Sequence, residues 1–263
     1  MTKYTQISLE RSHNDRIAIV TMQRAEVRNA LSPSLAADLR EAFTELRSDT
    51  RLHAVVLTGD GSAFSAGADL NAMKASATFS QEQNVQDALA MSDLFKSINT
   101  FPCAVIGRVN GAAMGGGLGL VAACDIVIAV DSAKLAFSEA RLGIAPAVIS
   151  PFVLRKIGEA QARLLFLTGE FFSAAYAREI GLVHVVTSAE ELDQAVEDKI
   201  AALLKSGPMA IRACKALALN VGQMDGETAR RYTAETLARL RSSAEGQEGV
   251  QAFLKKRQPN WIA

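Results

Sequence analysis

The chain has 263 residues, of which 49% are hydrophobic and 21% charged, and its 28 basic side chains balance its 28 acidic ones. The resulting net charge of zero argues against the broad positive surface that holds nucleic acid or an acidic membrane. The length allows one large domain with a sizeable core.

Cysteine and histidine usage argues against a metal site. Cys103, Cys124 and Cys214 form no CxxC spacing, and the three histidines lie far apart in no ligand spacing. We therefore expect free, buried thiols in a reducing compartment and no bound metal. Segment 1–16 lacks the apolar core of a signal peptide, and the uncharged run 109–124 is too short to span a bilayer. These features predict a cytoplasmic protein with no membrane partner.

The front half of the chain alternates strand and helix. Apolar or alternating runs predict strands at 4–9, 16–22, 54–58, 103–109, 125–130 and 134–137. Ser32 before Pro33 predicts the start of a helix that reaches about residue 48. Ser80–Gln83 reads as a capping box for a helix that ends near Asn99. This alternation indicates an α/β fold.

The back half is mainly helical. We expect helices at 150–157 and 159–167, separated by Gly158, then a helix at 173–180 and a strand at 183–187. A second capping box, Ser188–Glu191, predicts a helix to about residue 205. Further helical runs start at Pro208, Glu227 and Glu245. With no linker or repeat, we expect one domain over 1–263, with an α/β core at 1–200 and a helical region at 201–263 whose apolar faces need a partner.

One arrangement occurs twice: a buried strand, a glycine-bearing loop and a helix start, at 54–70 and at 103–120. Such loops leave backbone N–H groups free to bind a ligand. Two of them brought together can aim two N–H groups at one oxygen, as an oxyanion hole requires. The alternatives are two ordinary strand-to-helix turns, or a close-packed seam of small residues.

Two further motifs suggest other enzyme classes. Residues 117–122 fit the dinucleotide fingerprint GxGxxA, but loop residues separate these glycines from the preceding strand and no acid follows at the right distance. Ser65, within 63–67, resembles the nucleophile of a hydrolase. Its only candidate base is His184, which lies in an apolar strand where a structural histidine is the simpler reading.

Two acidic residues stand at the ends of apolar strands. Glu139 follows one, so burial can raise its pKa and suit it to acid or base catalysis. An exposed helix-start glutamate or a partner for Arg141 is the alternative. Asp125 stands at the head of a strand, and we interpret it as a structural acid that binds backbone groups.

Together these segments resemble the enoyl-CoA hydratase/isomerase (crotonase) superfamily. The similarity runs in order along the chain, through 24–31, 63–70 (AFSAGADL), 110–119 (NGAAMGGGLG), 124–126, 138–146 (SEARLGIAP), 167–169, 177–183 and 248–259. The resemblance implies a crotonase-like spiral of ββα units with a helical C-terminal trimerisation region, in a homotrimer or a dimer of trimers. It also implies an acyl-CoA thioester substrate and no separate cofactor, because coenzyme A is part of the substrate.

Residue by residue, the resemblance implies an oxyanion hole made by the N–H groups of Ala68 and Gly116, with Glu139 as acid/base. It implies a coenzyme A site along Val27, Arg28, Ala66, Asp69, Leu70, Gly115 and Gly119. On the same grounds Arg28 can reach a phosphate, and Lys256 can contact coenzyme A bound to a neighbouring subunit.

The chain departs from the family pattern at one catalytic position. Hydratases of the family carry two glutamates, and Gly119 stands where the first is expected, which leaves Glu139 alone. We expect a hydratase of a 2-enoyl-CoA. The alternatives are a 3-enoyl-CoA to 2-enoyl-CoA isomerase, a thioester-binding homologue with little turnover, and more remotely a hydrolase. Segment 145–151 (APAVISP), with GGGLGL at 115–120, resembles hydratases of branched glutaconyl-CoA substrates such as methylglutaconyl-CoA.

Overall fold

Two parallel-rich sheets form the frame of the protein, whose computed structural model describes residues 4–262. The six-stranded sheet has the order β1 (Ile7–Ser12), β2 (Ile17–Met22), β3 (Ala54–Gly59), β5 (Ala104–Val109), β7 (Ile126–Val130), β10 (Val185–Thr187). The four-stranded sheet has the order β4 (Ala63–Ser65), β6 (Ala112–Met114), β8 (Lys134–Ala136), β9 (Phe172–Ser173). Only the β1–β2 and β8–β9 pairs are antiparallel.

The chain winds as a spiral because each long strand continues into a short one. Strands β3, β5 and β7 of the large sheet lead directly into β4, β6 and β8 of the small sheet, and helices follow each pair. The helices are α1 (Pro33–Arg47), α2 (Leu70–Ser76), α3 (Gln81–Asn99), α4 (Gly116–Ala123), α5 (Ser150–Thr168), α6 (Ala174–Glu179), α7 (Leu192–Leu204), α8 (Pro208–Asn220), α9 (Gly226–Ser242) and α10 (Ala244–Leu254). The expected α/β spiral with a helical C-terminal region is confirmed.

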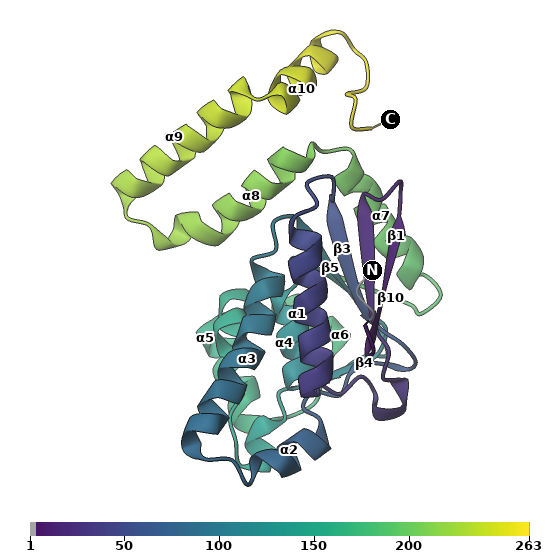
Figure 1. The fold of residues 1–263 in the computed structure, drawn as a ribbon, viewed down its shortest axis with the longest axis vertical. Coiled ribbons are helices and arrows are strands. Elements are labelled where there is room, and N and C mark those ends of the chain that lie inside the picture. The colour runs from purple at the N-terminus through teal and green to yellow at the C-terminus, as the bar shows by residue number, and fades with distance from the viewer. Residues whose placement is uncertain (1–3, 263) are drawn as a thin grey trace.

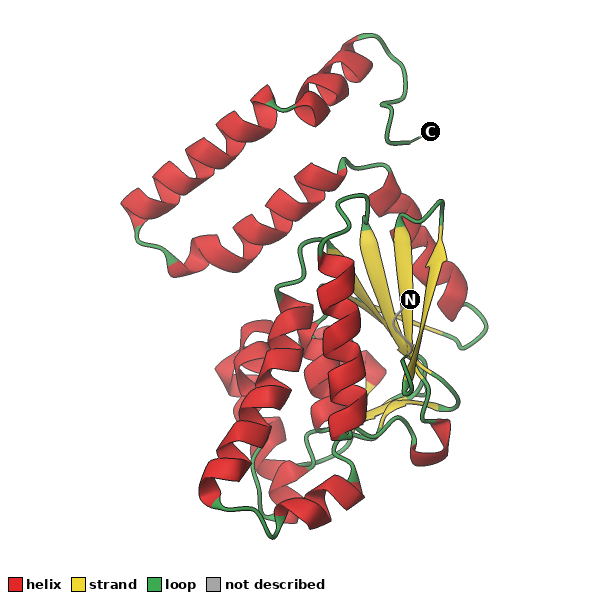
Figure 2. Ribbon diagram, in the orientation of Figure 1, coloured by secondary structure: helices red, strands yellow, loops and turns green. Residues whose placement is uncertain are grey.

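The helices enclose the large sheet (Figures 1 and 2). Helix α1 packs on β1 and β2, and α3, α4 and α5 follow it side by side, whereas α7 packs on β5, β7 and β10. Phe43, Phe64, Phe95, Phe101 and Phe137 are fully buried between these layers. Burial of the apolar strand faces on both sides explains why β3 and β5 read as continuous hydrophobic runs.

Local capping chemistry places the helix starts. Ser32 Oγ accepts the N–H of Leu35 at the start of α1, and Ser80 forms a complete capping box with Gln83 at the start of α3. Gly158, with φ of +70°, interrupts α5 where two helices were expected.

Helices α8, α9 and α10 form an arm that projects from the core (Figure 1). Glu245 of α10 accepts the N–H groups of Met209 and Ala210, which caps α8 from within the arm. Apolar side chains on the arm remain exposed, Phe253 by 83% and Leu254 by 73%. The expectation that this region needs a partner agrees with that exposure, and the trimeric or hexameric state stays a prediction.

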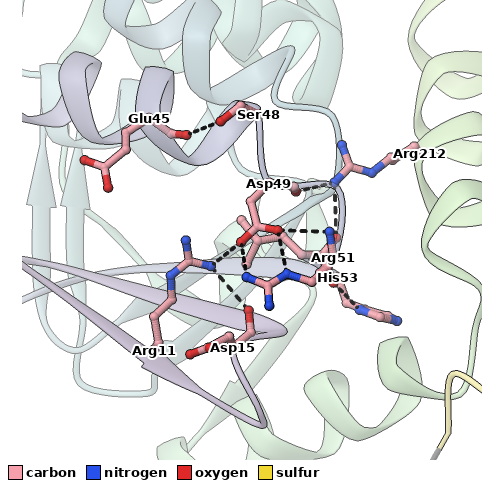
Figure 3. Close-up of polar contacts among 9 residues, drawn as sticks. Arg11, Asp15, Glu45, Ser48, Asp49, Arg51, His53 and Arg212 are labelled. Atoms are coloured by element: carbon pink, nitrogen blue, oxygen red, sulfur yellow. Dashed lines mark hydrogen bonds and ion pairs between the residues drawn. The ribbon is translucent and has the colours of Figure 1, made fainter.

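A polar cluster fixes the end of α1 to the neighbouring hairpin and the arm (Figure 3). Asp49 pairs with Arg11 at 3.0 Å and with Arg51 at 3.3 Å. Arg212 of α8 donates to the backbone oxygen of Asp49 at 2.9 Å, and His53 contacts the backbone oxygen of Arg51 at 3.0 Å. Of these bonds, the one from Arg212 fastens α8 to the segment between α1 and β3.

Several sequence-based expectations need correction. The segments of β4 and β6 were expected to be loops, because three-residue strands leave no periodic pattern. The helix start expected at the end of 103–120 is that of α4, which begins at Gly116, so the later glycines lie in the helix and not in the loop. Helix α7 begins at Leu192, and Ser188 closes a turn with Glu191 one turn earlier instead of capping the helix.

The expected buried thiols are Cys103 and Cys124, and burial raises the pKa of each to about 12. Cys214 is free but exposed, because it faces outward on α8. Within residues 4–262, no group of three or more His, Cys, Asp or Glu side chains is close enough to hold a metal. No helix in this described range is long and apolar enough to cross a membrane.

Asp125 has the structural role expected of it. Its Oδ2 accepts the N–H of Val105 at 2.7 Å and pairs with Lys215 Nζ at 2.6 Å, so it joins the sheet to α8. Burial raises the pKa of Asp125, and the charge of Lys215 opposes that rise.

We expect Lys215→Met to lower the free energy of unfolding by about 3 kcal/mol, because it leaves Asp125 as an uncompensated, largely buried charge. Urea denaturation at fixed protein concentration measures this change. Arg163→Met is the matched control, since Arg163 pairs with Glu159 on the exposed face of α5 and should change stability by about 0.5 kcal/mol or less. Equal effects of the two substitutions would contradict the role of Asp125.

Candidate active site

The loops after β4 and β6 lie against each other. Strands β4 and β6 pair in parallel, and Gly67, with φ of +85°, packs on the turn after β6. A Cβ added at Gly67 would lie 2.6 Å from the Met114 backbone oxygen and 3.5 Å from the Gly116 nitrogen. Only glycine permits this approach. The two glycine loops expected to converge are therefore in direct contact.

Each loop presents one backbone N–H without an acceptor. Ala68 follows Gly67, and Gly116 is the first residue of α4, where a helix leaves its N–H groups unpaired. Neither the Ala68 nor the Gly116 N–H donates to another group within residues 4–262. The Gly116 nitrogen also lies at the positive end of the α4 dipole.

Glu139 brings a carboxylate to the same place. It begins a short 3₁₀ turn after β8, and a Cβ on Gly115 would lie 2.9 Å from its Oε1 atom. Its Oε2 atom is buried and has no hydrogen-bond partner in the described part of the chain. Burial raises the pKa of Glu139. Arg141 instead stacks over Phe171, so the alternative reading of Glu139 as its ion-pair partner is wrong.

Two cavities meet at this point. One of about 260 Å³ lies between α2, α3 and the segment before α5, and the other, of about 540 Å³, opens toward the loop before α1. Residues lining both are Ala68, Asp69, Met73, Gly116 and Glu139. The free N–H groups and the unpaired carboxylate thus stand at the junction.

The smaller cavity, which we call the apolar cavity, is walled mainly by hydrocarbon. Its lining includes Leu31, Phe79, Met91, Phe95, Val148 and Ile149. Among the described residues, its charged lining consists of Asp87 together with Asp69 and Glu139, and the last two also line the larger cavity. The α3 residues Met91 and Phe95 were not identified from the sequence, because an apolar helix face looks the same whether it packs on a core or on a ligand.

The larger cavity, which we call the entry cavity, contains most of the expected coenzyme A residues. Val27, Arg28, Ala66, Leu70 and Gly115 all line it. Lys74 of α2 adds a second cation beside Arg28 and was not identified from the sequence. Exposed Leu70, Leu142 and Ile144 give its rim an apolar character.

Two expected residues, Asp69 and Lys256, have other surroundings. Asp69 lines both cavities, but its carboxylate pairs with Arg24 at 3.0 Å and caps α2. Lys256 lies exposed at the end of α10 and lines neither cavity, so its contact with a neighbouring subunit's ligand stays a prediction.

Gly119 lines neither cavity, so the cavities do not support its place on the expected coenzyme A path, which stays a prediction. A Cβ at this position would lie 2.3 Å from Ile149 Cγ2 and 2.9 Å from Phe95 Cε1. The space that a second carboxylate would need is therefore filled by two apolar side chains that also line the apolar cavity.

The other motifs have structural roles. Ser65 is fully buried and donates its hydroxyl to the backbone oxygen of Asn29 at 2.8 Å. His184 Nδ1 accepts the N–H of Val127, in β7 of the large sheet, at 2.9 Å, whereas Ser65 belongs to β4 of the small sheet. The pair cannot form a nucleophile and base, and the glycines of 117–122 lie inside α4.

Comparison with known proteins identifies relatives over nearly the whole chain. Residues 12–263 match the family model described as Enoyl-CoA hydratase/isomerase. The Crotonyl-CoA hydratase of Syntrophomonas wolfei is 32% identical to this chain, in an alignment that covers 99% of each protein. An enoyl-CoA hydratase from Shewanella pealeana has a TM-score of 0.93 at 35% identity, covering 98% of this chain and 97% of that one. The structure of Pseudomonas aeruginosa AtuE has a TM-score of 0.95 at 33% identity, and the match covers 98% of this chain and 100% of that one.

We expect Gly119→Ala to lower the free energy of unfolding by about 1–3 kcal/mol, because its Cβ forces Ile149 or Phe95 to move. Thermal or urea denaturation tests this. Gly226→Ala is the matched control, since a Cβ there meets nothing within 4 Å and should not destabilise the protein. Ile149→Ala should cost less stability in the Gly119→Ala background than in the wild type, because it removes the atoms that the added Cβ meets. A Gly119→Ala protein as stable as the wild type would show that the space is not filled.

Proposed function

The chain belongs to the enoyl-CoA hydratase/isomerase family, and we propose that it hydrates the double bond of a 2-enoyl-CoA thioester with Glu139 as its single acid/base. The observation that supports this proposal is the position of Glu139, whose buried Oε2 has no hydrogen-bond partner among the described residues, at the junction of two cavities and beside the free N–H groups of Ala68 and Gly116.

The proposed binding mode follows from the two cavities. The thioester oxygen accepts the N–H groups of Ala68 and Gly116. The acyl chain enters the apolar cavity, and the coenzyme A portion extends through the entry cavity. Arg28 and Lys74 there can pair with phosphates, while the apolar rim covers the pantetheine and adenine.

Glu139 then moves the protons. As a carboxylate it takes a proton from water while the water oxygen bonds to the β-carbon, and the double-bond electrons shift toward the thioester oxygen. The two N–H donors stabilise the resulting enolate, and a single such donor is typically worth about 3 kcal/mol. The protonated Glu139 then delivers its proton to the α-carbon, so the net change is addition of one water.

A 3-enoyl-CoA to 2-enoyl-CoA isomerase is the second candidate, and the surroundings of Gly119 favour it. Because Ile149 and Phe95 fill the space beside Gly119, no second carboxylate stands there to hold water. One base suffices for isomerisation, in which Glu139 removes a proton from the α-carbon and returns it to the γ-carbon. The same enolate and the same two donors serve both reactions.

The lining of the apolar cavity bears on the acyl group. No lysine or arginine of residues 4–262 lines it, and Asp87 would repel a second negative charge. This composition favours an uncharged acyl chain, straight or branched. A glutaconyl-type substrate, which segment 145–151 suggests, would have to direct its carboxylate toward Arg28 and Lys74 in the entry cavity.

A substrate panel separates the candidates by product mass. We expect crotonyl-CoA or a branched 2-enoyl-CoA to gain one water, whereas a 3-enoyl-CoA that shifts to its 2-enoyl isomer at unchanged mass would support the second candidate. Methylglutaconyl-CoA tests the carboxylated class. Release of free coenzyme A would indicate a hydrolase, and tight thioester binding with no turnover would indicate a binding protein.

We expect Glu139→Gln to lower kcat by about 100-fold or more with little change in thioester binding, because the amide cannot exchange a proton.

Burial raises the pKa of Glu139, so the carboxylate form is lost as pH falls through this raised value. The acid limb of kcat/KM should therefore lie above pH ~4.3, the range of an exposed glutamate. Wild-type turnover by the variant on the true substrate would refute this role.

A further inference from the structure

In the loop 66–69, every backbone N–H except that of Ala68 donates a hydrogen bond. The Ala68 N–H is thus free between bonded neighbours, although backbone donors in native loops are normally paired. The three neighbouring bonds are Ala66 N–H to Arg28 O at 2.8 Å, Gly67 N–H to Ser65 Oγ at 3.3 Å and Asp69 N–H to Leu31 O at 3.2 Å. The direction of the free N–H is thus fixed from both sides.

Ser65 supplies one of these bonds from a fully buried position. Its hydroxyl accepts the Gly67 N–H and donates to the backbone oxygen of Asn29 at 2.8 Å. Asn29 is itself buried and binds the backbone oxygens of Asp60 and Ala63, each at 2.9 Å. The hydroxyl therefore ties the glycine turn to the segment before α1.

Asp69 holds the other side of Ala68. Its side chain is almost fully buried, and its Oδ1 accepts the N–H groups of Asn71 and Ala72 at 2.9 and 3.2 Å. Its Oδ2 pairs with Arg24 Nη2 at 3.0 Å. The hydrogen bonds and the Arg24 charge outweigh burial and lower the pKa of Asp69, so the group is ionised at neutral pH.

Arg24 lines neither cavity, so it is placed to act on the loop rather than on a ligand. It donates to the Ala30 backbone oxygen through Nη1, and its own N–H binds Asn29 Oδ1 at 3.0 Å. Its charge also neutralises the carboxylate of Asp69, the residue that follows Ala68. Without that cation, Asp69 would place an uncompensated negative charge beside the developing oxyanion.

We propose that Arg24, Ser65 and Asp69 are positioning residues that hold the Ala68 N–H as an oxyanion donor and shield the oxyanion from the Asp69 charge. The inference rests on the proposed function, because it requires a thioester oxygen at Ala68. It assigns Asp69 to the loop geometry instead of to contact with coenzyme A.

The test compares Ser65→Ala, Asp69→Asn and Arg24→Met. The first readout is kcat on the substrate found by the panel, with the Kd of the thioester measured separately. The second is the absorption maximum of a bound aryl-acryloyl-CoA, which moves to longer wavelength when its carbonyl is polarised. Matched controls are Ser48→Ala, which removes a hydroxyl bonded to a backbone oxygen at the end of α1, and Asp225→Asn, which alters an exposed helix cap.

We expect Ser65→Ala and Asp69→Asn to lower kcat by about 10-fold or more and to reduce the absorption shift, with Kd changed by less than about threefold. Arg24→Met should lower kcat further, because it leaves the Asp69 charge unpaired. Adding Asp69→Asn to Arg24→Met should then restore part of the activity and of the shift. The controls should match the wild type in both readouts.

A purely structural ion pair would instead make the double variant no better than Arg24→Met. Variants that retain wild-type kcat and the full absorption shift would overturn the inference while the proposed function stands. A wild-type protein that neither shifts the chromophore nor turns over any enoyl-CoA would refute the proposed function itself. If Arg24→Met does not fold, Asp69→Asn still decides the question, since the asparagine oxygen can continue to cap α2.

Discussion

The contact between Gly67 and the Met114 backbone is the constraint on which the candidate site depends. At 2.6 Å from the place where a Cβ would stand, the Met114 oxygen leaves room for no side chain. This approach sets the turn after β4 against the turn after β6, and so brings the N–H groups of Ala68 and Gly116 to one location. The spiral supports it, because β4 and β6 are neighbours in the small sheet.

Two carboxylates flank these donors, and their surroundings give them opposite properties. Glu139 is partly buried without a partner for Oε2, so its pKa is raised and it can exchange a proton. Asp69 is bound by Arg24 and by two backbone N–H groups, so it stays ionised and is held in place. A difference in environment, rather than in residue type, separates the proposed acid/base from the proposed positioning group.

The apolar side chains around Gly119 bear on which reaction the site can support. Ile149 and Phe95 pack where a side chain at position 119 would extend. The space that the glutamate of other family members would occupy is therefore filled by these two side chains. If Glu139 is the single acid/base, as we propose, both the hydration and the isomerisation can proceed without a second catalytic glutamate. The choice between them depends on whether water has access to the β-carbon beside this wall.

Features that depend on local chemistry could be predicted from the sequence. Ser32 and Ser80 mark helix starts because a side-chain cap acts within three residues, and the strands of the large sheet are apolar because both faces are covered. The glycine loops and Glu139 could also be identified, since their motifs are contiguous. The three-dimensional fold was needed to show that Asp69 pairs with Arg24, that Ile149 and Phe95 fill the space at Gly119, and that Cys214 is exposed. Those outcomes depend on which distant segments come into contact, and no local pattern of residues encodes that contact.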